Sequence, residues 1–162
     1  MVWSNAPQKV YHGTDDASAE AIRAQIDLTV CSPAGVDFGP GFYVTSLWHE
    51  ARHWARLRSQ QRQREAAIVE FDLDREAIAR LGDHLTFTLP SDDYFDFVAY
   101  NRAGSPHHGR PGDPPRHYDI VYGPVSRLPD RKLISGWDQL CCLSEQATRC
   151  LTLRQIQPIG TI

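Results

Sequence analysis

The order of β-rich and helix-like segments constrains the fold of this chain more than any other feature of its sequence. Segments whose hydrophobic residues recur at every second position predict strands, and hydrophobic spacings of three and four predict helices. Both kinds occur along the 162 residues, but they do not follow the regular strand–helix–strand order of parallel sheets. The mixture favours an α+β fold with largely antiparallel sheets, and the length fits a single domain over residues 1–162.

The individual segments can be placed from these periodicities and from the turn-forming residues between them. Strands are expected at residues 9–12, 42–45, 67–73, 118–125 and 139–143. Helices are expected at residues 15–25, 47–64, 74–81, 92–102 and 144–153. Either Asp15 or Asp16 can cap the first helix. Residues 103–117 are crowded with Gly, Pro and His, so they predict a flexible surface insertion or a loop that faces a substrate.

The composition excludes several classes of protein. A hydrophobic fraction of 41% and a charged fraction of 23% are typical of a soluble globular chain, and the net charge of −3 argues against a broad nucleic-acid-binding surface. No apolar run has the length of a signal peptide or a membrane span. We therefore expect a cytoplasmic protein without membrane contact, or one exported without an N-terminal mark. The four cysteines include no C-x-x-C pair and are expected to be reduced and buried.

One short motif suggests a metal site. Residues 49–53 read HEARH, which matches the H-E-x-x-H signature of zinc metalloproteases. On a helix, His49 and His53 share a face and can bind one zinc ion, while Glu50 acts as the general base. The motif alone therefore predicts a small zinc protease.

The surroundings of this motif argue against zinc. Arg52 lies inside the motif, where its positive charge disfavours a metal ion. A catalytic zinc needs a third ligand, but the carboxylates that follow lie on or beside a predicted strand. The hydrophobic face of the helix runs through Ala51 and Trp54, so both histidines are expected to be exposed. The zinc protease is kept as the lower alternative.

Two other segments fit together better. Residues 11–14 read YHGT at the end of a predicted strand, and residues 38–45 read FGPGFYVT ahead of the helix that carries Trp54. This layout resembles the ADP-ribosyltransferase superfamily, and within it the poly(ADP-ribose) polymerase branch, where H-G-T or H-G-S precedes F-G-x-G-[IF]-Y. The stretches DFVAYNR, YDIVYGPV and DQLCCLSEQATRCL also resemble small uncharacterised bacterial proteins, often found beside a small partner protein as toxin–antitoxin pairs are. The resemblance covers Val10–Leu153.

The resemblance implies a fold, an activity and partners. The fold would consist of two packed, largely antiparallel sheets that form an NAD cleft, with flanking helices. The activity would be NAD-dependent ADP-ribosylation, which breaks the nicotinamide–ribose bond and needs no metal. The acceptor of ADP-ribose would be a protein, a nucleic acid or a small molecule. By this resemblance the chain would be the toxin of a bacterial toxin–antitoxin pair and would have a cognate antitoxin as partner.

The resemblance also assigns residues to the site. The catalytic residues would be His12, Tyr43 and Gln139, and the NAD-binding residues would be Tyr11, His12, Gly13, Thr14, Tyr43, Trp54, Asn101 and Arg102. His12 would bind the adenosine ribose, and Gly13 would let the backbone approach the nicotinamide amide. Tyr43 would stack on the nicotinamide, and Trp54 would be a second stacking aromatic. The alternative for these residues is packing in the core.

Gln139 departs from the pattern of the superfamily. A glutamate usually occupies this position and binds the 2′-hydroxyl of the nicotinamide ribose. A glutamine can accept the same hydrogen bond but carries no negative charge, so it would stabilise a developing cation less. The alternative function is therefore a catalytically idle module that binds NAD or ADP-ribose. Arg102 would meet the NAD pyrophosphate or would be an exposed arginine at a helix end.

Overall fold

The computed structural model describes residues 7–31, 35–105, 114–127 and 130–160. Two compact units make up the chain. Unit 1 consists of Met1–Asp27, Val44–Arg80 and Arg149–Ile162, and unit 2 consists of Leu28–Tyr43 and Leu81–Thr148. The single domain over residues 1–162 stays a prediction.

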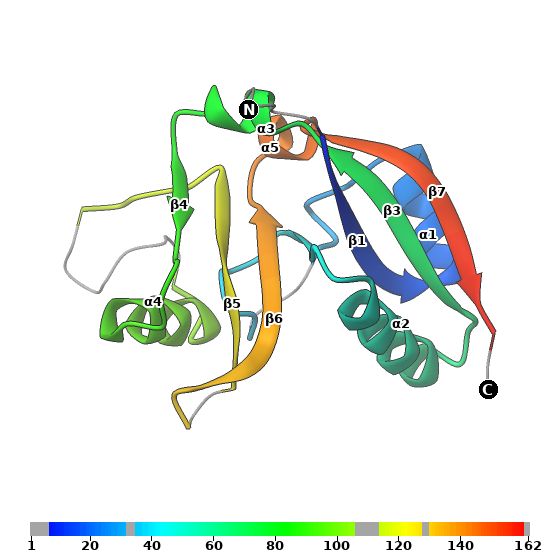
Figure 1. Cartoon of the computed structure of the whole chain (residues 1–162), viewed down its shortest axis with the longest axis horizontal. Coiled ribbons are helices and arrows are strands. Elements are labelled where there is room, and N and C mark those ends of the chain that lie inside the picture. Colours follow the sequence, from blue (N-terminus) through cyan, green and yellow to red (C-terminus); the bar gives the residue numbers. More distant parts are fainter. Residues whose placement is uncertain (1–6, 32–34, 106–113, 128–129, 161–162) are drawn as a thin grey trace, which may run out of the picture. The chain divides into compact units, whose positions relative to one another are not determined.

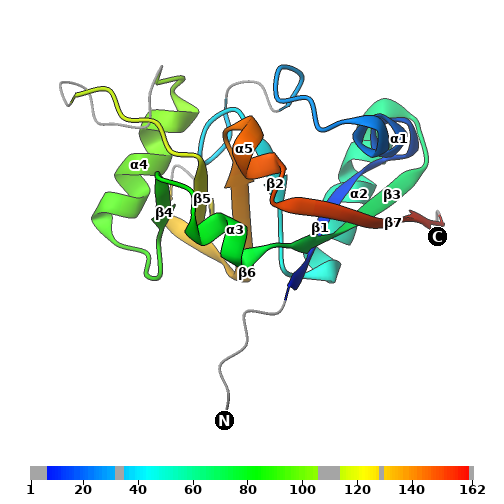
Figure 2. The same ribbon diagram turned by 90° about the horizontal axis from the view of Figure 1, so that it is seen from above.

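Unit 1 is built on a three-stranded antiparallel sheet (Figure 1). The strands are, in spatial order, β1 (Gln8–Asp15), β3 (Ala66–Leu73) and β7 (Leu151–Ile159). The helices of this unit are α1 (Asp16–Ala24), α2 (Trp48–Arg62) and α3 (Arg75–Ala79). From above, as in Figure 2, β1, β3 and β7 again lie side by side.

The central strand β3 is buried on both faces. Ala66 and Ile68 pack against Ala51 and Ala55 of α2. The alternate positions are equally buried, and Val69 has no exposed surface. Strand β3 lies between β1 and β7, and both of its faces are covered.

Side-chain interactions cap the start of α1 and connect it to the end of α2. Asp15 caps α1, since its Oδ1 accepts a hydrogen bond of 2.9 Å from the Ser18 amide. Its Oδ2 also accepts from Nη1 of Arg62 at 2.7 Å, which ties the start of α1 to the end of α2. Helix α2 ends at Gln63, whose φ of 53° places it in the left-handed region.

Unit 2 is built on a four-stranded sheet. Its spatial order is β2 (Phe42–Val44), β6 (Lys132–Cys142), β5 (Ile120–Arg127) and β4 (His84–Thr86). Strands β5 and β6 are antiparallel, whereas β4 runs parallel to β5. The helices are α4 (Asp92–Arg102) and α5 (Glu145–Thr148), and β4, β5 and β6 are visible side by side in Figure 1.

The core of unit 2 forms where α4 meets the sheet. Tyr94 and Val98 of α4 pack with Phe38, Val121 and Cys141, and all five are fully buried. Helix α4 has the bounds that the sequence predicts. It begins after a cap in which the hydroxyl of the preceding serine accepts from the Tyr94 amide at 3.2 Å.

The structure confirms the α+β class and the largely antiparallel pairing. The predicted helix over residues 144–153 is wrong, because only Glu145–Thr148 is helical and Leu151–Ile159 pairs with β3. The short strand β4 was not predicted. An ADP-ribosyltransferase-like fold with an NAD cleft stays a prediction. The central part of the predicted loop insertion, residues 106–113, lies outside the described residues.

Two further expectations concern cysteines and membranes. Cys141, Cys142 and Cys150 are buried free thiols, as predicted, but Cys31 is only half-buried. Among the described residues, no helix is long and apolar enough to cross a bilayer.

Candidate functional site

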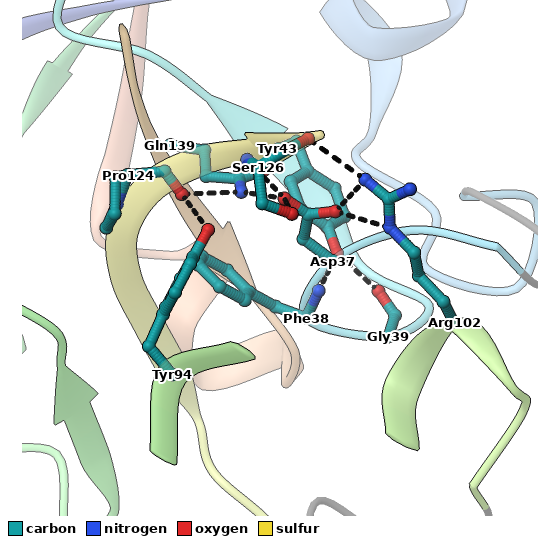
Figure 3. Close-up of polar contacts among 9 residues, drawn as sticks. All are labelled: Asp37, Phe38, Gly39, Tyr43, Tyr94, Arg102, Pro124, Ser126 and Gln139. Atoms are coloured by element: carbon teal, nitrogen blue, oxygen red, sulfur yellow. Dashed lines mark hydrogen bonds and ion pairs between the residues drawn. The ribbon is translucent and has the colours of Figure 1, made fainter. Parts of the chain in front are cut away.

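Unit 2 contains a buried polar cluster centred on Asp37 (Figure 3). We call Asp37, Arg102, Ser126 and Gln139 the Asp37 cluster. Asp37 lies in the segment before β2, Arg102 ends α4, Ser126 lies on β5 and Gln139 lies on β6. Asp37 is only 5% exposed, and its carboxylate accepts hydrogen bonds from all three other members of the cluster. The cluster therefore joins four segments that are distant in sequence.

The Asp37 carboxylate is paired at both oxygens. Oδ1 accepts from Arg102 Nε at 2.7 Å and from Arg102 Nη2 at 2.5 Å. Oδ2 accepts from the Ser126 amide at 3.1 Å and from the Ser126 hydroxyl at 3.2 Å. A buried carboxylate is tolerated only when it is paired and hydrogen-bonded in this way. Asp37 thus holds a carboxyl group inside unit 2 that is paired with Arg102 and hydrogen-bonded at both oxygens.

Gln139 lies against this carboxylate. Its Nε2 donates to Asp37 Oδ2 at 2.7 Å and to the carbonyl oxygen of Pro124 at 3.0 Å. The same carbonyl accepts from the Tyr94 hydroxyl at 2.7 Å. No described residue donates a hydrogen bond to Gln139 Oε1. The amide therefore has both N–H groups engaged and its oxygen available as an acceptor.

Tyr43 closes the loop that carries Asp37. Its hydroxyl donates to the Gly39 carbonyl at 2.7 Å and accepts from the Phe38 amide at 2.9 Å. The rings of Tyr43 and Phe38 stack with their centroids 6.4 Å apart. Burial raises the pKa of the Tyr43 hydroxyl well above its usual range, so this group stays protonated.

The two glycines of the FGPGF stretch are each required for a different structural reason. Gly39 has a φ of 87°, a backbone angle that residues with a side chain rarely adopt. A Cβ at Gly41 would lie 2.5 Å from Sγ of Cys141 and 2.7 Å from the Cys142 carbonyl oxygen. The loop needs glycine at the first position for its backbone turn and at the second for its close approach to β6.

The two predicted NAD-binding residues of α4 have different environments. Asn101 is buried, and its Nδ2 donates to the Phe97 carbonyl at 2.8 Å within the same helix. Arg102 is partly exposed and is held by Asp37, and its Nη2 also donates to the Ser126 carbonyl at 3.2 Å. Its Nη1 takes no part in these bonds. Arg102 thus keeps one end of its guanidinium group outside the Asp37 cluster, while Asn101 faces the protein.

The predicted residues of β1 lie in unit 1. Tyr11 packs against the α2–β3 core, and Gly13 lies on the same face because side chains alternate along a strand. His12 and Thr14 point to the other face, where His12 is half-buried and Thr14 is buried. Tyr11 and Gly13 thus lie on one face of β1, and His12 and Thr14 lie on the other.

Gly13 has a packing role that the sequence does not reveal. A Cβ at this position would lie 1.9 Å from the carbonyl oxygen of Ala51 and 2.7 Å from the amide nitrogen of Ala55. The strand and helix α2 therefore approach so closely that no side chain fits between them. This requirement exists whether or not the backbone here also approaches a ligand.

The HEARH segment lies on the first half of α2. His49 and His53 are exposed, as predicted, but Glu50 is only 2% exposed. Glu50 Oε2 accepts from the Thr45 hydroxyl at 2.9 Å, and Oε1 accepts from the Trp54 indole at 3.4 Å. The residue that would be the general base of a protease is thus turned inward and anchors the helix. No group of three metal-ligating side chains exists among the described residues.

Trp54 is half-buried, and its indole N–H is engaged with Glu50. Its ring meets the His53 imidazole edge-on, with 5.4 Å between centroids. Arg102 and Gln139 bond the Asp37 carboxylate, and the Tyr43 hydroxyl bonds the backbone of the next two residues. Trp54 belongs to unit 1 with the β1 residues.

Sequence reasoning did not single out Asp37 or Ser126. Asp37 carried no local signal, because the burial of its carboxylate depends on donors from α4, β5 and β6. Ser126 carried no such signal, since its role depends on the register of β5 beside β6.

A family model described as "Protein of unknown function (DUF3990)" matches residues 8–129, which is more than half of the chain. His12, Asp37, Tyr43 and Arg102 lie inside the matched region, and Gln139 lies beyond its end. No curated protein matches the sequence.

Proposed function

The chain belongs to the DUF3990 family, so its function has to be argued from the site itself, and we propose that it is an NAD-dependent ADP-ribosyltransferase. The observation that carries the proposal is that Arg102 and Gln139 both bind the buried Asp37 carboxylate, while Tyr43 holds the loop that carries Asp37 (Figure 3). The resemblance in the sequence assigns all three to NAD, although they lie on different elements. Their convergence supports a common role.

Cleavage of NAD needs few protein groups, and these residues are of the required kinds. Cleavage of the nicotinamide–ribose bond passes through an oxocarbenium-like transition state, as glycoside cleavage does. Gln139 Oε1 is an available acceptor for a ribose hydroxyl. The Nη1 end of the Arg102 guanidinium suits a pyrophosphate oxygen. Tyr43 offers an aromatic ring whose hydroxyl is held by the loop. The resemblance alone assigns His12, a residue of unit 1, to the adenosine ribose.

The proposal includes a biological setting that rests on the resemblance alone. The chain would modify a macromolecule and act as the toxin of a bacterial toxin–antitoxin pair, with a cognate antitoxin as partner. Growth of a bacterial host that expresses the chain, with and without a small protein encoded beside it, tests this setting separately from the chemistry.

Turnover of NAD is the direct test. The purified chain is incubated with NAD labelled in the nicotinamide ring and, in parallel, with NAD labelled in the adenine together with cell extract. We expect release of nicotinamide and transfer of the adenine label to an acceptor. His12→Ala and Gln139→Ala should abolish both signals. Asp138→Asn is the matched control, because Asp138 neighbours Gln139 on β6 but bonds Tyr122.

Two results would contradict the proposal. The first is a folded wild-type chain that releases no nicotinamide and transfers no label. The second is release that persists at the wild-type rate in both His12→Ala and Gln139→Ala. Circular dichroism of each variant shows whether a loss of activity reflects a loss of fold.

A second candidate is a binding module that does not turn NAD over. The observation that favours it is the neutral Gln139 amide, whose nitrogen is engaged with Asp37 and Pro124. Calorimetry with a non-hydrolysable NAD analogue separates the two candidates. Binding of the analogue without any nicotinamide release from NAD would favour the module.

A further inference from the structure

We propose that Asp37 is a positioning residue that makes Gln139 act as a hydrogen-bond acceptor in place of a carboxylate. The inference rests on the proposed function, because it assigns the Gln139 oxygen to the ribose of NAD. It goes beyond that function by naming a residue outside the predicted site and by giving a reason for glutamine at position 139. It is carried by the hydrogen bonds of the Gln139 side-chain amide.

The orientation of the Gln139 amide is determined by its two partners. Both N–H groups of Nε2 point at groups that can only accept, the Asp37 carboxylate at 2.7 Å and the Pro124 carbonyl at 3.0 Å. A rotation of the amide by half a turn would place Oε1 against these same two oxygens. That arrangement loses two hydrogen bonds in a buried position and creates repulsion instead. Gln139 therefore presents its oxygen, and never its nitrogen, to a ligand.

Asp37 is itself held firmly enough to impose this orientation. Arg102 binds one carboxylate oxygen with two N–H groups, and the amide and hydroxyl of Ser126 bind the other. These four donors come from α4 and β5, so the carboxylate is anchored to two elements before Gln139 is considered. Figure 3 shows the carboxylate between Arg102 on one side and Gln139 and Ser126 on the other.

The charge of Asp37 also changes the acceptor strength of Gln139. A carboxylate that accepts a hydrogen bond from an amide nitrogen polarises the amide and increases the electron density on its oxygen. The low dielectric of a buried site strengthens this effect. The oxygen presented to the ribose hydroxyl is thus a better acceptor than the oxygen of an exposed glutamine.

The same geometry disfavours glutamate at position 139. A second carboxylate within 2.7 Å of Asp37 would form a like-charged pair, and one member would have to be protonated. A neutral side chain with an acceptor oxygen avoids this conflict. Glutamine at position 139 and aspartate at position 37 are therefore a matched pair.

Exchanging the carboxylate and the amide between positions 37 and 139 tests whether the two residues act as a pair. The rate of nicotinamide release from NAD is measured for wild type, Asp37→Asn, Gln139→Glu and the double variant that carries both changes. We expect Asp37→Asn to lower kcat about tenfold or more while KM for NAD changes less, because the Pro124 carbonyl alone then orients the Gln139 amide and the charge that polarises it is lost. The double variant should recover only part of the lost kcat. The introduced carboxylate would accept from the introduced amide and again present only oxygen, but the Pro124 carbonyl would lose its donor and the Ser126 amide its acceptor.

Two further measurements separate positioning from simple structural support. Asp138→Asn is the matched control, because Asp138 neighbours Gln139 on β6 and its Oδ2 accepts from the Tyr122 hydroxyl, outside the Asp37 cluster. Its kcat should stay near the wild-type value. Gln139→Glu alone should make kcat depend on pH, because two carboxyls in contact share a proton, and the double variant should lose this dependence.

The inference is overturned if wild type turns NAD over and Asp37→Asn does so equally well. It is also overturned if the double variant is folded and no more active than Asp37→Asn. If Asp37→Asn fails to fold, the pH profile of Gln139→Glu decides, and a profile equal to that of wild type refutes the pair. Absence of turnover in wild type refutes the proposed function first and the inference with it.

Discussion

Replacement of Gly13 by alanine tests the closest approach between elements in unit 1. The new Cβ would lie 1.9 Å from the carbonyl oxygen of Ala51 and 2.7 Å from the amide nitrogen of Ala55. Both atoms belong to the backbone of α2, so they cannot move away by a change of rotamer. Strand β1 and helix α2 would have to separate, and the two alanines, which have no exposed surface, would lose contact with the sheet.

The magnitude of this effect follows from the kind of atoms that clash. Insertion of a methyl group into a packed core costs about 1–3 kcal/mol and occasionally more. Gly13→Ala belongs at the upper end, about 3 kcal/mol, because a contact this short to a helix carbonyl leaves no small adjustment. This is a large share of the roughly 5–15 kcal/mol that stabilises an ordinary domain.

Urea denaturation followed by circular dichroism measures this cost. With a slope of about 1–3 kcal/mol per molar urea, a loss of about 3 kcal/mol should lower the midpoint by about 1–3 M. Gly82→Ala is the matched control, because a Cβ there would meet no atom within 4 Å, and its midpoint should stay the same or rise slightly. A Gly13→Ala chain as stable as wild type would refute the packing argument. If that variant also failed to bind NAD, the ligand role implied for Gly13 would be the better explanation.

Three further outcomes are expected. Gly41→Ala should destabilise unit 2 by about 1–3 kcal/mol in the same urea assay, because its Cβ would lie 2.5 Å from the Cys141 sulfur. Burial raises the pKa of Asp15, but hydrogen bonds from α1 and α2 outweigh it and lower that pKa overall, so its stabilisation is present at neutral pH and is lost as pH falls below about 4. Asp15→Ala should therefore lower the free energy of unfolding by about 1 kcal/mol at pH 7 and by less in acid. Asp16→Ala, which leaves the cap in place, should not show this loss. Of the four thiols, only Cys31 should react with iodoacetamide in the native protein, as measured by mass spectrometry.

Each of these outcomes has a result that would contradict it. A Gly41→Ala chain with an unchanged urea midpoint would mean that the loop and β6 do not approach as described. Equal losses for Asp15→Ala and Asp16→Ala, independent of pH, would remove the cap from the explanation. Rapid alkylation of Cys141 in the folded chain would contradict its complete burial.

Helix periodicity was the most reliable signal in the sequence. The prediction for residues 92–102 matches α4, and the prediction for residues 47–64 contains α2. These segments show their buried face through residues three and four positions apart, which is local information. Glu50 is the exception within α2, since its burial depends on the Thr45 hydroxyl and the Trp54 indole.

Strand assignment failed where pairing decided the outcome. Residues 151–153 read Leu-Thr-Leu and fit a strand, but the predicted helix that begins at Ser144 was extended through them. The structure stops α5 at Thr148 and pairs β7 with β3 along Leu151–Ile159. Strand β4 was missed because three residues carry too little periodicity, and it exists only through its pairing with β5.

The sequence by itself determined the α+β class, most helices, and the segments that carry His12 and Tyr43, because these depend on periodicity, caps and short motifs. Only the tertiary structure decided that Asp37 lies between Arg102 and Gln139. The physical reason is that the cost of a buried carboxylate is met by donors from α4, β5 and β6, which are distant along the chain. Such a partnership has no local pattern, so neither the buried charge nor the orientation it gives Gln139 can be read from the residues around either position.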